Sequence, residues 1–117
     1  MTPTRATPPA DYPVDTASGW QPIPGVPDGV QQMPLAGELD EDVKTGRRTR
    51  LIRFAPGTLN DNVFVHDYWE EFFLMEGTLE VDGQALEGYA YALRPPGTAH
   101  GPFFSRSGCI FLETQYY

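Results

Sequence analysis

From residue 47 to the C-terminus, apolar residues gather in short runs that glycine and proline separate, a pattern typical of β-strands. We expect strands over residues 47–54, 63–66, 70–75, 78–81, 89–93, 99–104 and 109–116. The Asp82-Gly83 pair between two apolar runs predicts a tight hairpin turn. No segment shows a helical period. The pattern therefore predicts an all-β sandwich or barrel.

The N-terminal third has a different composition. The first 34 residues hold eight of the 12 prolines, and proline removes a backbone donor and favours extended or turn conformations. We expect residues 1–19 to form a flexible arm and residues 20–117 to form a single domain. Apolar content rises from Trp20 to Leu35, so this part is expected to lie across the domain, or across a neighbouring subunit, as an extended strap.

Two oppositely charged stretches follow one another, the first before and the second largely within the strand expected over residues 47–54. The acidic residues 37–42 are expected to form a solvated turn. Five of the eight basic residues come next: Lys44, Arg47, Arg48, Arg50 and Arg53. We interpret them as the wet face of an edge strand close to acidic residues. The alternative is a site for an anion.

Composition narrows the class of protein. A net charge of −8 argues against nucleic acid or an anionic membrane as a partner. No apolar run approaches the roughly 18 residues of a membrane span, and the N-terminus lacks the apolar stretch of a secretion signal. Cys109 is alone, so no internal disulfide is expected, and its apolar surroundings predict a small buried residue. We expect a cytoplasmic protein.

The two histidines lie beside apolar β-type runs about 30 residues apart. On a strand, residues two apart face one side, so Phe64 and His66 point together, and Glu70 follows after a short turn. A carboxylate in an apolar interior needs a compensating charge. Two imidazoles and a carboxylate form the facial triad typical of non-haem iron, if a strand carries His100 to the same place. The alternatives are structural or surface histidines and an exposed acid, and spacing alone does not choose between them.

At these residues the sequence resembles the cupin superfamily. The first cupin motif is matched by Gly57, His66, Glu70 and Gly77, and the second, with one extra residue, by Gly88, Pro95, Gly97 and His100. The resemblance covers residues 20–116 and is greatest to the branch with the cupin domain of zinc-binding anti-sigma factors and the acetylacetone and dihydroxyacetophenone dioxygenases. It implies a double-stranded β-helix, or jelly-roll barrel, holding a divalent metal such as Fe, Zn, Mn or Ni.

The chain departs from this family at two positions. Phe64 stands where the family has its first histidine, and Phe104 replaces an asparagine that often follows the last one. Either His66, Glu70 and His100 hold a metal with three ligands, or the metal is lost and an aromatic pocket remains. In a pocket, Phe64, Phe72 and Phe104 would be the walls against the substrate, and the alternative is that they are ordinary core residues.

The resemblance implies a metal-dependent enzyme acting on a small enol, diketone or hydroxyketone-like substrate, with dioxygenase-type C–C cleavage as the main expectation. The alternatives are a non-oxidative isomerase, cyclase or lyase, and a non-catalytic small-ligand-binding cupin. Tyr68 or Glu71 would serve as a general base, or both would be rim residues. The strap and the Tyr116-Tyr117 end predict a homodimer, unless they fold back within one chain.

Overall fold

The computed structural model describes residues 11–117, so the flexibility predicted for residues 1–10 lies outside the described residues. The strands are β1 (Gln21–Pro22), β2 (Val30–Asp40), β3 (Thr45–Phe54), β4 (Thr58–Asn60), β5 (Trp69–Val81), β6 (Gln84–Glu87), β7 (Ala90–Arg94), β8 (Phe103–Ser105) and β9 (Cys109–Tyr116). Residues 11–117 contain no helix long and apolar enough to cross a membrane.

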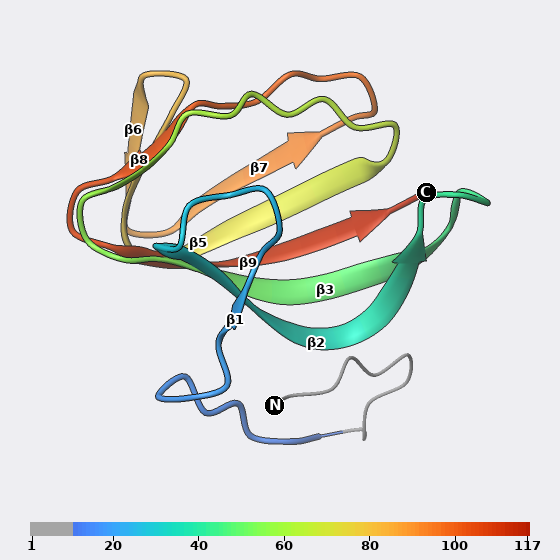
Figure 1. Cartoon of the computed structure of the whole chain (residues 1–117), viewed down its shortest axis with the longest axis horizontal. Coiled ribbons are helices and arrows are strands. Elements are labelled where there is room, and N and C mark those ends of the chain that lie inside the picture. The colour runs from blue at the N-terminus through green and yellow to red at the C-terminus, as the bar shows by residue number, and fades with distance from the viewer. Residues whose placement is uncertain (1–10) are drawn as a thin grey trace.

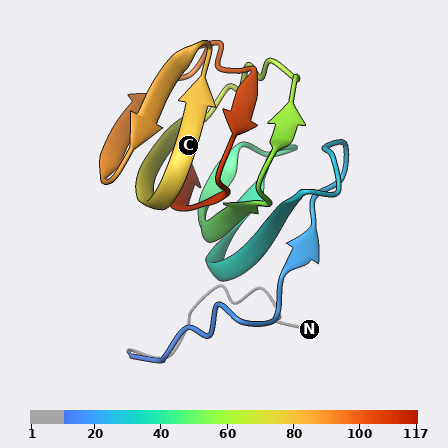
Figure 2. The same ribbon diagram turned by 90° about the vertical axis from the view of Figure 1, so that its left-hand side faces the viewer.

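The strands form two antiparallel layers that share β5 (Figure 1). The larger layer has the order β1-β2-β3-β9-β5-β7. The end of β5, from Thr78 to Val81, pairs instead with β6 and β8, and β8 pairs with β4 to complete the smaller layer. Seen after a quarter turn, the strands surround a common interior (Figure 2). This is the barrel-like, all-β architecture that the sequence predicts.

Alternation along the central strands decides which side chains enter the barrel. In β9 the odd-numbered residues from Cys109 to Gln115 are buried, and the even-numbered residues are only partly buried. The register places Glu70 of β5 opposite Gln115 and Leu74 opposite Phe111. Since paired residues point to the same face of a sheet, their side chains meet inside the barrel.

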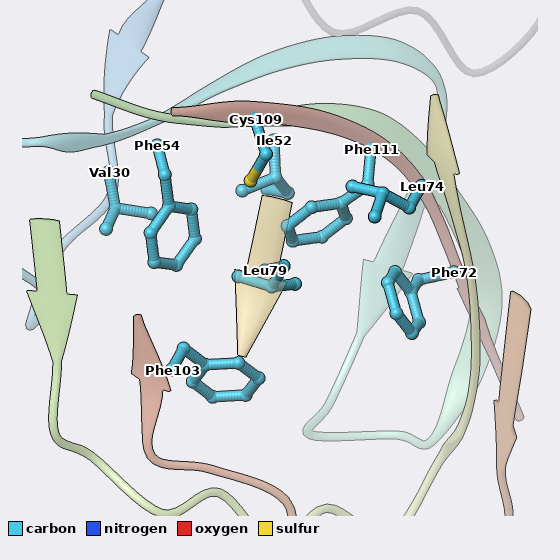
Figure 3. Packing of buried hydrophobic residues seen from close by; sticks show 9 residues of the cluster. All are labelled: Val30, Ile52, Phe54, Phe72, Leu74, Leu79, Phe103, Cys109 and Phe111. Atoms are coloured by element: carbon cyan, nitrogen blue, oxygen red, sulfur yellow. The ribbon is translucent and has the colours of Figure 1, made fainter. Parts of the chain in front are cut away.

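The interior has an apolar end and a polar end. The apolar end is the core cluster drawn in Figure 3. Its buried members are Val30, Ile52, Phe54, Phe72, Leu74, Leu79, Phe103, Cys109 and Phe111. The polar end holds Glu70, His100, Glu113 and Gln115, all buried. The buried position predicted for Cys109 is confirmed.

Several strand boundaries differ from the sequence prediction. The two predicted strands 70–75 and 78–81 are one strand, β5, with a register shift between Leu74 and Glu76. Residues 63–66 form only an isolated bridge from Phe64 to His100, and β8 begins at Phe103 instead of at residue 99. The Asp82-Gly83 hairpin is confirmed, with positive φ at both residues, as a type I′ turn requires.

The predicted strap, residues 20–35, has two parts: the first packs against the core, and the second is a strand of the sheet. β2 already begins at Val30, so residues 30–35 belong to the sheet and are not a loose strap. The predicted acidic turn is also shorter, because residues 37–40 continue β2. Before β2, Ile23 and Val26 pack against the core cluster. The Arg53 guanidinium lies over the Trp20 ring, with its Cζ 4.4 Å from the centre of that ring.

The interpretation of the basic stretch as an edge strand is wrong. β3 lies between β2 and β9 and is paired along its length on both sides. Alternation turns Arg47 and Arg53 outward but Arg48 and Arg50 into the barrel, where both line a cavity. Arginines on a strand usually indicate exposure to water, but here Arg48 and Arg50 find polar partners on β9.

Candidate metal centre and cavity

Three predicted ligands meet at the polar end of the barrel. The ligand atoms of His66, Glu70 and His100 all lie within 4.8 Å of one another. His100 Nε2 is 3.2 Å from Glu70 Oε2, and His66 Nε2 is 3.9 Å from Glu70 Oε1. The structure therefore brings together the three residues that were predicted from two separate motifs.

Backbone hydrogen bonds hold the two motifs in place. Phe64 and His100 exchange a pair of N–H···O bonds of 2.8 and 3.0 Å. The Gly97 amide donates to the His66 carbonyl oxygen at 2.7 Å, just after the Pro95-Pro96 turn. The Phe64 ring lies 5.8 Å from the His66 ring and 6.0 Å from the His100 ring, centre to centre. A phenyl group without a donor atom thus stands against both imidazoles.

Glu70 is buried and has polar partners on every side. Gln115 donates to its Oε1 at 2.8 Å, and the Arg94 guanidinium lies 3.3 Å from its Oε2. Burial raises the pKa of Glu70, but hydrogen bonds with His100 and Gln115 and the nearby positive charges outweigh burial and lower the pKa to about 2. The carboxylate is therefore ionised at neutral pH and available as a ligand.

The donor set fits a divalent cation. His100 Nδ1 lies 3.2 Å from the Thr98 carbonyl oxygen, which only accepts, so Nδ1 carries the hydrogen. A bound cation would take the place of the hydrogen between His100 Nε2 and Glu70 Oε2, which lie 3.2 Å apart. Burial lowers the pKa of His66, which favours a neutral ring with a free lone pair. Two imidazole nitrogens and a carboxylate oxygen suit Fe, Zn, Mn or Ni.

The three candidate ligands line a cavity of about 360 Å³. This volume lies within the range of sites for small organic molecules. Phe64, Phe72, Phe103 and Phe111 supply apolar wall, and Ile23, Pro24 and Val26 cover one side. The Tyr68 ring stacks on His66 at 4.4 Å, and burial raises the pKa of its hydroxyl, which stays protonated at neutral pH.

Not every predicted site residue faces this cavity. Phe64, Phe72 and Tyr68 line it, whereas Phe104 is not among the described residues that do. Phe104 follows Phe103 on β8, so its side chain points to the opposite face, and Phe103 takes the place predicted for it. Glu71 also faces outward, where the Tyr91 and Tyr116 hydroxyls donate to it, so it is a rim residue and not a base at the centre.

Sequence reasoning missed a set of charged and amide side chains in the cavity. They are Arg48, Arg50, Arg94, Glu113 and Gln115. Arg50 Nε pairs with Glu113 Oε1 at 2.7 Å, and Arg48 donates from Nε to Gln115 Oε1 at 3.0 Å. The available signal was alternation, because Glu113 and Gln115 share a face of β9 with Cys109, which was expected to be buried.

Solved structures share this fold at low sequence identity. An acetylacetone dioxygenase from Acinetobacter johnsonii superposes with a TM-score of 0.71 at 19% identity, over 94% of this chain and 76% of that one. The polyketide cyclase RemF from Streptomyces resistomycificus gives 0.66 at 17% identity, over 91% and 79%. The anti-sigma factor ChrR of Rhodobacter sphaeroides, in complex with SigE, gives 0.62 at 16% identity, over 81% and 48%. At these identities the likeness concerns the fold alone.

No curated protein sequence gives a significant match to the chain. The family comparison is more decisive, because the model of the ChrR Cupin-like domain matches residues 12–116. That match spans both cupin motifs and all nine described strands, and so the chain belongs to the ChrR cupin-like family within the cupin superfamily.

Proposed function

We propose that this protein is a metal-dependent cupin enzyme that acts on a small enolisable substrate, with His66, Glu70 and His100 as the protein ligands. The observation that carries the proposal is the convergence of three donor atoms within 4.8 Å in the wall of a 360 Å³ cavity. A bound divalent ion would supply Lewis-acid polarisation of an enol, diketone or hydroxyketone oxygen pair.

The surrounding side chains prepare the site for such a substrate. Phe64 offers no donor atom, so the protein provides three ligands and leaves coordination positions for substrate or water. Phe72 and Phe103 provide apolar wall and exclude water from part of the cavity. Gln115 and Arg94 fix the orientation of the Glu70 carboxylate.

The reaction we propose first is dioxygenase-type cleavage of a carbon–carbon bond in the enolised substrate. Its support is the likeness to two acetylacetone dioxygenases, one of them putative by its description, together with the three-ligand site. In this proposal the cavity holds the enol against the metal ligands, and the apolar wall keeps bulk water away from the reacting carbons.

The second candidate is a non-oxidative isomerase, cyclase or lyase. A specific feature favours it: the Tyr68 hydroxyl remains protonated and its ring stacks on His66, so a proton donor lies beside a ligand. The likeness to a polyketide cyclase supports the same reading. The remaining alternative is a cupin that binds a small ligand without catalysing a reaction.

Elemental analysis of purified protein, together with Glu70→Gln and His100→Ala, tests the metal site. Both variants are expected to lose bound metal, since each removes one of three ligands. Glu71→Gln is the matched control, because this neighbouring carboxylate faces outward and should leave the metal content unchanged. Metal retained in full by both ligand variants would refute the assignment.

Oxygen uptake with a panel of β-diketones then separates the reactions. Uptake that depends on substrate and on bound metal supports the dioxygenase. Conversion of substrate without oxygen uptake supports the non-oxidative candidate. Metal and substrate binding without any conversion leaves the ligand-binding alternative.

A further inference from the structure

Among residues 11–117, one partly buried cation of the cavity wall, Arg48, forms no ion pair. Three arginines line it, and two are paired: Arg50 with Glu113 at 2.7 Å and Arg94 with Glu70 at 3.3 Å. Arg48 donates only to the neutral Gln115 side chain, and no carboxylate among residues 11–117 lies within 4.0 Å of its guanidinium. An unpaired guanidinium facing a cavity is the feature from which the inference starts.

The energetic argument concerns the cost of burying this charge. Transfer of an ion from water to a protein interior is expensive unless an opposite charge compensates it. Glu41 also borders the cavity, but it is exposed and forms no ion pair with Arg48. Three arginines and three acids line the cavity, and the two buried acids, Glu70 and Glu113, are the ones already paired with Arg94 and Arg50.

Arg48 is also connected to the candidate metal centre through the side chain of Gln115. The Gln115 amide accepts from Arg48 through Oε1 and donates to Glu70 Oε1 through Nε2. The strand register places Arg48, Gln115 and Glu70 side by side on β3, β9 and β5. Adjacent strands are about 4.8 Å apart, so the backbones of Arg48 and Glu70 are roughly 10 Å apart. Both residues also line the same cavity, so one small ligand in it can contact both.

We propose that Arg48 is a carboxylate-binding residue, and that the natural ligand is a small oxo acid whose carboxylate pairs with Arg48. The planar guanidinium matches a carboxylate in a two-point hydrogen-bonded pair. The enolisable oxygen of the same molecule then reaches His66, Glu70 and His100, and this second half of the inference rests on the proposed function. The neutral diketones are in this view poorer ligands than oxo acids of equal size.

The test compares acetoacetate with its methyl ester, which keeps the same enolisable carbonyl but lacks the charge. Calorimetric titration of wild-type protein is expected to give about tenfold or tighter binding of acetoacetate than of the ester. Arg48→Gln should abolish this preference without weakening the ester. The matched control is Arg47→Gln, one residue away on the same strand and exposed, which should preserve it.

Arg48→Lys guards against a folding failure of the glutamine variant. It keeps the charge but loses the two-point geometry, so it should retain only part of the preference. Equal binding of both compounds by wild type, no binding of either compound, or an unchanged preference in Arg48→Gln would each overturn the proposal.

The same titration on chelator-treated protein separates this proposal from the metal enzyme. A preference for acetoacetate over its ester that persists without metal supports the Arg48 subsite. This holds even if Glu70→Gln and His100→Ala retain their metal and the proposed metal site is refuted. Loss of the preference in Arg48→Gln with unchanged metal content supports the subsite and leaves the metal site intact. Metal-loaded protein without any preference removes the subsite alone.

Discussion

The side-chain amide of Gln115 donates a 2.8 Å hydrogen bond to Oε1 of Glu70, across the pairing of β9 with β5. Both residues are buried, at 2% and 4% exposure. The bond fixes the plane of the carboxylate that is proposed to bind the metal. Hydrogen-bonded partners of ligands commonly have large effects on metal affinity.

We therefore expect Gln115→Leu, which keeps the approximate volume and loses the amide, to weaken metal binding about 10- to 100-fold. The reason is that Glu70 loses the partner that orients it. A titration against a competing chelator measures the affinity. Thr114→Val, at the adjacent partly buried position on β9, is the control. Equal affinity in wild type and Gln115→Leu would show that Glu70 is oriented by other groups.

Phe64→His tests the ligand that is missing relative to the family pattern. The ring of Phe64 lies 5.8 and 6.0 Å from the two imidazoles, and its backbone is tied to His100, so a histidine there points toward the same centre. We expect about tenfold tighter metal binding and slower substrate exchange, because a fourth ligand would occupy an open position. The chelator titration gives the first value. Weaker binding would show that this position does not face the metal.

Leu79→Ala is expected to lower the free energy of unfolding by about 2–5 kcal/mol, because it opens a cavity in the core. Leu79 is 1% exposed and belongs to the cluster at the apolar end. Leu59→Ala, at a side chain that is 54% exposed, should change the free energy of unfolding by about 0.5 kcal/mol or less. Urea unfolding measures both. Similar losses in the two variants would contradict the assigned core.

Gly77→Ala is expected to be far more destabilising than Gly57→Ala. Both glycines have positive φ, 84° and 78°, so both variants carry a similar backbone strain of about 1–2 kcal/mol. A methyl group at Gly77 would lie 1.9 Å from the Gly108 carbonyl oxygen, whereas one at Gly57 meets nothing within 4 Å. The difference between their thermal midpoints isolates this close approach of β5 to β9. Equal midpoints would place the two strands farther apart.

The thiol of Cys109 should be unreactive in the folded protein. It is 4% exposed within the core, and burial raises its pKa, so the reactive thiolate is scarce. A disulfide reagent at pH 8 is expected to label the protein slowly under native conditions and rapidly in urea. Fast native labelling would mean that this end of the barrel opens readily.

The sequence pattern predicts the all-β fold, and the two motifs of the family resemblance indicate the three candidate ligands that the structure brings together. Gly and Pro punctuation reports where strands end, and the two half-motifs carry His66, Glu70 and His100. The Phe104 prediction failed because the segment after His100 is not a continuous strand, and β8 starts at Phe103. The break between His100 and Phe103 interrupts the alternation, so Phe103 and not Phe104 is buried together with His100.

The inward arginines could not be predicted from composition, because their direction depends on pairing partners distant in the chain. Arg48 faces Gln115, 67 residues away, and Arg50 faces Glu113. A polar strand becomes an internal one when its neighbours supply matching polar groups. The sequence pattern of β3 contains no information about those neighbours.

The homodimer remains a prediction. Tyr116 stacks on Trp69 of its own chain, and the Tyr117 hydroxyl donates to Asp67, so the C-terminal tyrosines have partners without a second copy. Sedimentation velocity decides the question: a species of twice the chain mass supports the dimer, and a single species of one chain mass refutes it.

Because the barrel has a polar end and an apolar end, ligand specificity and folding stability can change independently of each other. β5 begins at Trp69, next to the candidate ligand Glu70, and ends at Val81, which packs against the core cluster, so one strand contributes to both ends. Substitutions at Arg48, Tyr68 or Phe64 change the lining of the cavity. The core contacts of Leu74 and Leu79, which stabilise the fold, remain unchanged. New specificities are thus accessible to this scaffold through substitutions at one end only.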